Sequence, residues 1–125
     1  MNRDLATGID IVEVQRFRDL SPSIRERFFQ RVLTAGEREA MAGQFERAAG
    51  FFAAKEALSK ALGCGIGPIS WQEIEILKNE QGKPELKLYG NALKIAVQAG
   101  ISDWSLSISH TRQNAIAMVI GVIEN

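Results

Sequence analysis

The sequence is short of cysteine, of net charge and of long apolar runs, and each absence narrows the range of functions. Cys64 is the only cysteine among 125 residues, so an intramolecular disulfide cannot form and a reducing compartment is expected. Lysine and arginine total 15, as do aspartate and glutamate, which argues against a nucleic-acid-binding polycation. The N-terminus lacks a signal-peptide pattern, and no segment is long enough to span a bilayer. We therefore expect a cytoplasmic protein without a nucleic-acid or membrane partner.

Residue periodicity predicts a single α+β domain over residues 1–125. Apolar residues in alternating or continuous runs indicate strands at 5–12, 70–77, 85–88, 104–110 and 115–123. Helices are expected at 13–20, from Pro22, from the capping box that begins at Thr34, and at 91–99. The last strand is apolar almost throughout, so we expect both of its faces to be covered.

The longest predicted helix runs over residues 45–62 and ends at the glycines on either side of Cys64. It is rich in alanine, the residue with the highest helix propensity. Phe51 and Leu58 mark one apolar stripe, while Phe52 and Ala53 lie on the opposite side. A helix that is apolar nearly all round is expected to be buried, so its few polar residues need partners.

Three of these polar residues share one helix face, because Ser59 and Lys60 follow Glu56 by three and four positions. A glutamate and a lysine at this spacing also form a common surface pair, which is the alternative interpretation. Asp10 stands in the apolar strand at 5–12, where a buried carboxylate needs a cation or donors, unless it caps the following helix. Together, Asp10 and Glu56 would hold Mg²⁺ while Lys60 neutralises a phosphate oxygen, an arrangement suited to phosphoryl transfer.

Two further features admit a structural and a functional interpretation. His110, the only histidine, ends the strand at 104–110 and either bonds to the backbone there or donates to a phosphate in a substrate cleft. Residues 16–31 carry five arginines against two acidic residues, with phenylalanines between them. This segment is either an ordinary solvated surface or a docking surface for an acidic partner helix.

Four segments resemble the signature motifs of one known family. Residues 8–13 (GIDIVE), followed by Arg16 and Phe17, are similar to the first motif, and residues 52–63 (FAAKEALSKALG) are similar to the second and most specific one. Residues 82–84 (GKP) and 107–111 (SISHT) match later positions in the same order. On these motifs, which extend over nearly the whole chain, the sequence resembles the holo-acyl-carrier-protein synthases, the short type of 4′-phosphopantetheinyl transferase.

The resemblance implies a 4′-phosphopantetheinyl transferase fold, in which a small antiparallel sheet packs against the long buried helix and shorter helices. It also implies a homotrimer with active sites at the subunit interfaces. Such an enzyme moves the phosphopantetheine arm of coenzyme A to a serine of apo acyl carrier protein in fatty acid biosynthesis, releasing 3′,5′-ADP. Asp10 and Glu56 would hold Mg²⁺, or Mn²⁺, at the coenzyme A pyrophosphate. Lys60 would contact that pyrophosphate, and Glu56 is the favoured base for the serine proton.

The same resemblance assigns binding roles to other residues. The coenzyme A site would include Ser59, Lys60, Gly63, Pro84, His110 and Thr111. The acidic helix of the carrier protein would contact Arg16, Arg27 and Phe28.

Two positions depart from the family pattern, since Phe51 stands where many relatives carry an arginine and Cys64 where threonine is common. Without that arginine, the site either lacks the cation or takes it from Arg47 or Arg112. Two other functions stay open. One is a non-catalytic coenzyme A-binding module of the same fold, for which Phe51 is the only motivation. The other is a transferase that acts on a polyketide or peptide-synthetase carrier.

Overall fold

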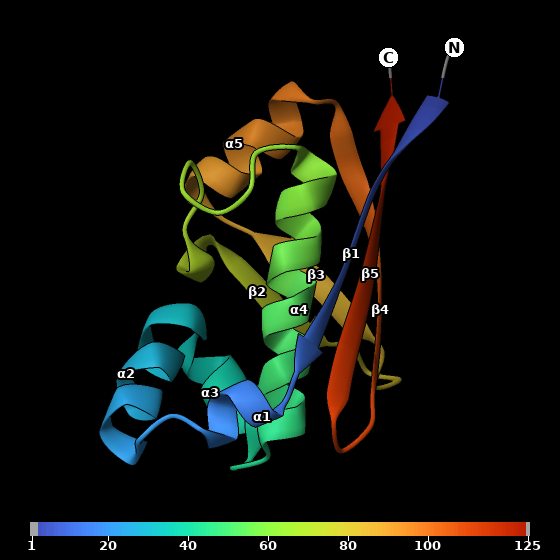
Figure 1. The fold of residues 1–125 in the computed structure, drawn as a ribbon. Helices are drawn as coiled ribbons and strands as arrows, with labels where there is room; N and C mark the ends of the chain where they lie inside the picture. Colours follow the sequence, from blue (N-terminus) through green and yellow to red (C-terminus); the bar gives the residue numbers. More distant parts are fainter. Residues whose placement is uncertain (1–2, 125) are drawn as a thin grey trace.

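The computed structural model describes residues 3–124, in which two antiparallel sheets are combined with helices (Figure 1). In chain order the elements are β1 (Arg3–Glu13), α1 (Gln15–Arg18), α2 (Pro22–Val32), α3 (Ala35–Met41), α4 (Phe45–Leu62), the 3₁₀ helix η1 (Trp71–Glu73), β2 (Ile74–Lys78), β3 (Pro84–Leu88), α5 (Gly90–Gln98), β4 (Ile101–His110) and β5 (Asn114–Glu124). Strand β5 lies between β1 and β4 in one sheet, while β2 and β3 form a separate hairpin sheet. This arrangement confirms the predicted α+β class.

Helix α4 has the predicted bounds and packs against the three-stranded sheet. Gly63 ends it in the left-handed conformation, with φ of 77°, and its N–H donates to the Lys60 carbonyl at 3.0 Å. Strand β1 crosses α4 so closely that a Cβ at Gly8 would collide with the Ala57 carbonyl oxygen. Only glycine fits this crossing. Although α4 is largely buried, no helix within residues 3–124 combines the length and apolarity needed to cross a membrane.

The helices all lie on one side of the three-stranded sheet, as Figure 1 shows, and within residues 3–124 they leave its other face uncovered. Large apolar side chains of β1 and β5 are exposed on this outer face. Ile9 lies opposite Met118 and Ile11 opposite Ile116, and Ile11 is 64% exposed. Leu5 extends the same surface along β1. We call these five residues the outer sheet patch.

The prediction that both faces of residues 115–123 are covered is therefore wrong within one chain. Ala115, Ala117 and Val119 are buried, whereas Ile116 and Met118 between them are exposed. The alternation is that of a strand with one face toward the core. Within residues 3–124 this other face stays exposed, so a subunit contact could cover it.

Two predicted elements begin in a different type of secondary structure from the one expected. The helix predicted at 13–20 contains only Gln15–Arg18, because Glu13 still pairs with Asn114 in the sheet. The strand predicted at 70–77 begins as the helix η1, where the Glu73 carboxylate accepts the Ser70 N–H at 2.8 Å. Extended pairing starts only at β2. The capping box predicted at Thr34 is confirmed at the start of α3.

A fully buried ion pair ties α4 to the elements around it. Lys55 Nζ donates to Glu37 Oε1 at 2.7 Å, to the Val32 carbonyl at 2.7 Å and to the Trp71 carbonyl at 3.0 Å. The other Glu37 oxygen accepts the Ile76 N–H at 2.8 Å. Burial lowers the pKa of Lys55, and the Glu37 carboxylate opposes that shift. Because three acceptors surround Nζ, we assign the ammonium form, which has three donors.

Candidate active site

The first cluster of predicted site residues lies where β1 crosses α4. Lys60 Nζ donates to the Asp10 carboxylate at 3.0 Å and to the Ile9 carbonyl at 2.9 Å. The Lys60 side chain is 52% exposed and that of Asp10 is 19% exposed. Asp10 pairs with Ala117 within the sheet, so the alternative that it caps a helix is wrong. Solvent, and hence an anionic ligand, can reach the ammonium of this pair.

Glu56 lies one turn before Lys60 on α4. Burial raises the pKa of Glu56 and the Asp10 carboxylate raises it further, while Lys60 and Arg16 oppose the shift. Within residues 3–124, no hydrogen bond or ion pair engages the Glu56 carboxylate, because Lys60 donates to Asp10 instead. The alternative of a simple Glu56–Lys60 surface pair is therefore wrong. Glu56 keeps an unpaired acceptor beside a second carboxylate.

These two carboxylates fit a hard divalent cation. A cation between them would remove the repulsion that contributes to the raised pKa of Glu56. Within the described part of the chain, no third acidic, histidine or cysteine side chain completes a metal-binding group with Asp10 and Glu56. Mg²⁺ tolerates so small a set, because it retains several waters and commonly binds one or two carboxylates together with substrate phosphates.

Three of the residues predicted to bind coenzyme A already have local roles. Ser59 is only 1% exposed, and its Oγ donates to the Glu56 carbonyl at 2.7 Å. Gly63 is the exposed C-cap of α4. The Thr111 hydroxyl accepts the Gln113 and Asn114 N–H groups in the β4–β5 turn. A binding role for each of the three stays a prediction.

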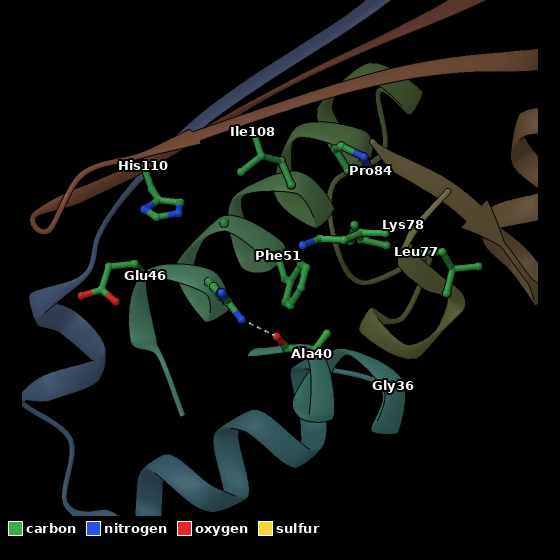
Figure 2. Close-up of a pocket in the computed structure, with 12 residues that line it drawn as sticks. Gly36, Ala40, Glu46, Phe51, Leu77, Lys78, Pro84, Ile108 and His110 are labelled. Carbon is green, nitrogen blue, oxygen red and sulfur yellow. Dashed lines mark hydrogen bonds between the residues drawn. The ribbon is translucent and has the colours of Figure 1, made fainter. Parts of the chain in front are cut away.

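A cavity of about 450 Å³ lies between α4, the β2–β3 hairpin and the end of β4 (Figure 2). Pro84 and His110, both predicted to bind coenzyme A, line it. Phe51 and Ile108 supply apolar surface. Gly50 gives Ile108 room to approach, since a Cβ at Gly50 would lie 3.0 Å from Ile108 Cγ2. The cavity thus offers an apolar surface next to an imidazole.

Charged side chains border the same cavity. Arg47 on α4 donates to the Ala40 carbonyl at 3.2 Å, and Lys78 projects from β2 on another wall, next to Phe51 (Figure 2). Glu46 also borders the cavity, but Arg18 of α1 pairs with it at 2.6 Å. The charge left unbalanced at this cavity is therefore positive. Nothing in the sequence pattern singles out Lys78.

The carboxylate pair and the cavity lie on opposite sides of α4. Phe51 and Glu56 are five residues apart, which separates them by about 140° around the helix axis. Asp10 and Ile108 both pair with Ala117, so they lie on the two outer strands, about 10 Å apart across the sheet. A single chain therefore does not bring the predicted site residues into one cleft.

Two of the three residues predicted to dock a carrier protein contact the Phe52 ring, one turn before Glu56 on α4. The Arg16 guanidinium lies 5.6 Å from the centre of the Phe52 ring, and Phe28 packs on the same ring with centroids 5.8 Å apart. Arg16 is one of the cations that oppose the raised pKa of Glu56. Arg27 is exposed on α2. Arg16 and Phe28 thus meet near Glu56, and Arg27 adds charge on the outer surface of α2.

Known proteins share both this sequence and this fold. The 4′-phosphopantetheinyl transferase superfamily matches residues 6–119. The holo-[acyl-carrier-protein] synthase of Caldanaerobacter subterraneus subsp. tengcongensis is 44% identical over 122 residues, which cover 95% of each chain. The Helicobacter pylori holo-[acyl-carrier-protein] synthase in complex with coenzyme A has a TM-score of 0.83 and 35% identity, over 92% of this chain and 98% of that one. The corresponding Neisseria meningitidis structure has a TM-score of 0.83 and 36% identity, over 93% and 96%.

The chain therefore belongs to the 4′-phosphopantetheinyl transferase superfamily and, within it, to the holo-[acyl-carrier-protein] synthases. This membership confirms the family resemblance and the fold expected from the motifs at residues 8–13 and 52–63.

Proposed function

We propose that this chain transfers the 4′-phosphopantetheine group of coenzyme A to a serine of an apo acyl carrier protein. The cluster of Asp10, Glu56 and Lys60 carries the proposal, because it combines two carboxylates with a cation that solvent can reach. The serine oxygen bonds to the β-phosphorus of coenzyme A, the bridging P–O bond breaks, and 3′,5′-ADP leaves with its electrons. Glu56 takes the serine proton, because no hydrogen bond or ion pair within residues 3–124 occupies its carboxylate.

Asp10 and Glu56 would hold Mg²⁺, and Mn²⁺ has a similar preference for oxygen ligands. The bound ion would supply positive charge at the pyrophosphate. Lys60, whose ammonium contacts Asp10 at 3.0 Å, would add its charge to the same group. A lysine in this position needs no covalent role, because phosphoryl transfer depends mainly on positioning and on charge neutralisation.

We further propose that the complete site forms between two chains of a homotrimer. The carboxylate pair and the cavity lie at opposite edges of the sheet, so neighbouring chains can supply one each. The outer sheet patch supports assembly, since exposed apolar surfaces of this kind often mark protein interfaces. The 1–125 chain would act as a single domain, as expected for its length.

Co-expression of two impaired variants tests the shared site. Glu56→Gln disables the carboxylate pair and His110→Ala disables the cavity, so each variant alone should transfer slowly. In mixed trimers, about a quarter of the sites would join an intact pair to an intact cavity, and activity should recover to that extent. Sites built within one chain would show no recovery.

The carrier protein would dock on α1 and α2. Arg16 and Arg27 provide charge for an acidic helix, and Phe28 provides an apolar contact beside Glu56. We place the reaction in the cytoplasm and in fatty acid biosynthesis, with polyketide and peptide-synthetase carriers as competing acceptors. Transfer rates measured on purified carriers of each class will rank these acceptors.

The reaction is tested by incubating the protein with apo acyl carrier protein, coenzyme A and Mg²⁺, and then weighing the carrier by mass spectrometry. The carrier should gain one phosphopantetheine group, and EDTA should prevent the gain. Tight coenzyme A binding without transfer to any carrier would instead support the non-catalytic binding module.

A further inference from the structure

The cavity beside Phe51 combines an apolar floor, formed by Phe51, Ile76 and Ile108, with a cationic rim, formed by Arg47 and Lys78. This combination suits one particular part of coenzyme A. We propose that Arg47, assisted by Lys78, binds the 3′-phosphate of coenzyme A in this chain. The inference rests on the proposed function. It identifies a cation on the same helix face as Phe51, which carries no charge itself.

Arg47 is placed to do this. It precedes Phe51 by four residues on α4, so the two side chains leave the same face of the helix one turn apart. Its guanidinium donates to a neutral carbonyl, that of Ala40, and no carboxylate within residues 3–124 pairs with it. The hydrogen bond to Ala40 uses one of the five N–H donors of Arg47, which leaves four donors available to an anion.

The surroundings of the cavity favour Arg47 over Arg112 as the phosphate-binding cation. Arg18 pairs with Glu46, the one carboxylate that the described part of the cavity lining contributes. Arg112 does not border the cavity within residues 3–124, and its carbonyl accepts a hydrogen bond from Arg18 at 3.2 Å. Lys78, on the β2 wall, adds a second cation.

Phe51 provides apolar surface in the same cavity. It is 9% exposed and faces a cavity that Ile76 and Ile108 also line. Such a surface suits a flat aromatic base, whereas a phosphate needs the charged rim. An adenosine 3′-phosphate carries both features a few ångströms apart, so one ligand can satisfy the floor and the rim together.

The pyrophosphate of coenzyme A is a poorer match for Arg47. The carboxylate pair and Lys60 are already assigned to that group, and they lie on the opposite side of α4 from the cavity. Of the phosphate groups in coenzyme A, the 3′-phosphate is the one left for the cavity. This assignment is tested by ligands that differ only in that group.

Binding of 3′,5′-ADP and of 5′-AMP should be measured by titration calorimetry, since the second ligand lacks only the 3′-phosphate. Arg47→Ala should weaken 3′,5′-ADP about tenfold and leave 5′-AMP unchanged. Arg47→Lys should recover part of the loss, and Lys78→Ala should show a smaller, equally selective loss. Lys94→Ala removes an exposed positive charge from α5 and serves as the matched control.

An equal loss of both ligands in Arg47→Ala would overturn the proposal, because it would mean that the Ala40 contact only shapes the cavity. Unchanged binding of both ligands would overturn it as well. Transfer kinetics give a second readout: KM for coenzyme A should rise while KM for dephospho-coenzyme A stays constant. The calorimetry needs no turnover, so a chain that binds 3′,5′-ADP through Arg47 but transfers nothing would contradict only the proposed function.

Discussion

Helix α4 contributes the lysines of two ion pairs, Lys55 and Lys60, which are five residues apart. The two pairs differ in how deeply they are buried and in whether all of their hydrogen-bonding groups have partners. Lys55 and Glu37 are 0% exposed, and every oxygen or proton between them has a partner. Lys60 is 52% exposed, and its partner Asp10 lies beside the unpaired Glu56. A satisfied buried pair can only hold elements together, whereas an exposed pair next to an unpaired acid can exchange partners with a ligand.

The largest effect is expected from a substitution of Glu56, beside the exposed Lys60–Asp10 pair. Glu56→Gln should lower the kcat of transfer about 100- to 10,000-fold, because it removes a metal ligand and the proposed base. Its melting temperature should stay close to that of the parent protein. Rates on an apo carrier and a thermal melt measure both quantities, with Glu39→Gln on the exposed surface of α3 as control. Near-normal turnover would remove Glu56 from the mechanism.

Breaking the buried pair should instead affect the fold. Lys55→Met should lower the free energy of unfolding by about 3–5 kcal/mol, because Glu37 would be left buried without its cation. Urea denaturation measures the change, and Lys94→Met should stay within about 0.5 kcal/mol of the parent protein. A stable Lys55→Met protein with lost activity would show that Lys55 serves the reaction and not the stability of the fold.

For the exposed Lys60 we expect the reverse of Lys55: a small change in stability together with a loss of activity. Lys60→Gln should change the free energy of unfolding by less than about 1 kcal/mol, as for most exposed ion pairs. It should nevertheless lower kcat/KM about tenfold, because a cation at the pyrophosphate is lost. Denaturation and steady-state kinetics on one preparation separate the two effects. A large stability loss without a kinetic effect would make this pair structural too.

The smallest effect is expected for Glu73, which belongs to neither ion pair. Its carboxylate accepts backbone N–H groups, so it shows what a carboxylate contributes without a lysine partner. Hydrogen bonds from the Ser70 and Asn91 N–H groups hold the pKa of Glu73 below its usual value. Because the folded pKa is the lower one, Glu73 stabilises the fold above pH 4.5, and this contribution is lost as the pH falls through the folded pKa. Glu73→Gln should cost about 0.5 kcal/mol or less near neutral pH, because solvent screens this carboxylate, and the difference should vanish in acid, as urea melts at several pH values would show. A difference that is constant with pH would contradict this account.

Local features explain what the sequence could predict. The bounds of α4 follow from an alanine-rich segment that ends at Gly63, and the start of α3 follows from the capping box of Thr34 and Glu37. Residue type alone grouped Asp10, Glu56 and Lys60 in one predicted phosphate and metal site, but the hydrogen bond between Lys60 and Asp10 was not predicted. The two helix boundaries required no knowledge of distant packing.

The remaining features depend on how distant elements meet. Lys55 stands next to Glu56 in sequence and looks like another solvated charge, but it points the other way, toward α3 and η1. The second bond of Glu37, to Ile76, joins residues 39 positions apart and leaves no local signal. The separation of the carboxylate pair from the cavity arises from the order of the strands in the sheet, which no motif records.

Gly8 shows how a residue without a side chain can resemble a catalytic one. A Cβ there would collide with the Ala57 carbonyl, so any substitution must push β1 away from α4 and draw Asp10 away from Lys60. In a saturation-mutagenesis map of activity, Gly8 should therefore be as intolerant as the charged residues. Mutational sensitivity alone would misassign it as part of the chemistry, whereas its contribution is a distance between two backbones.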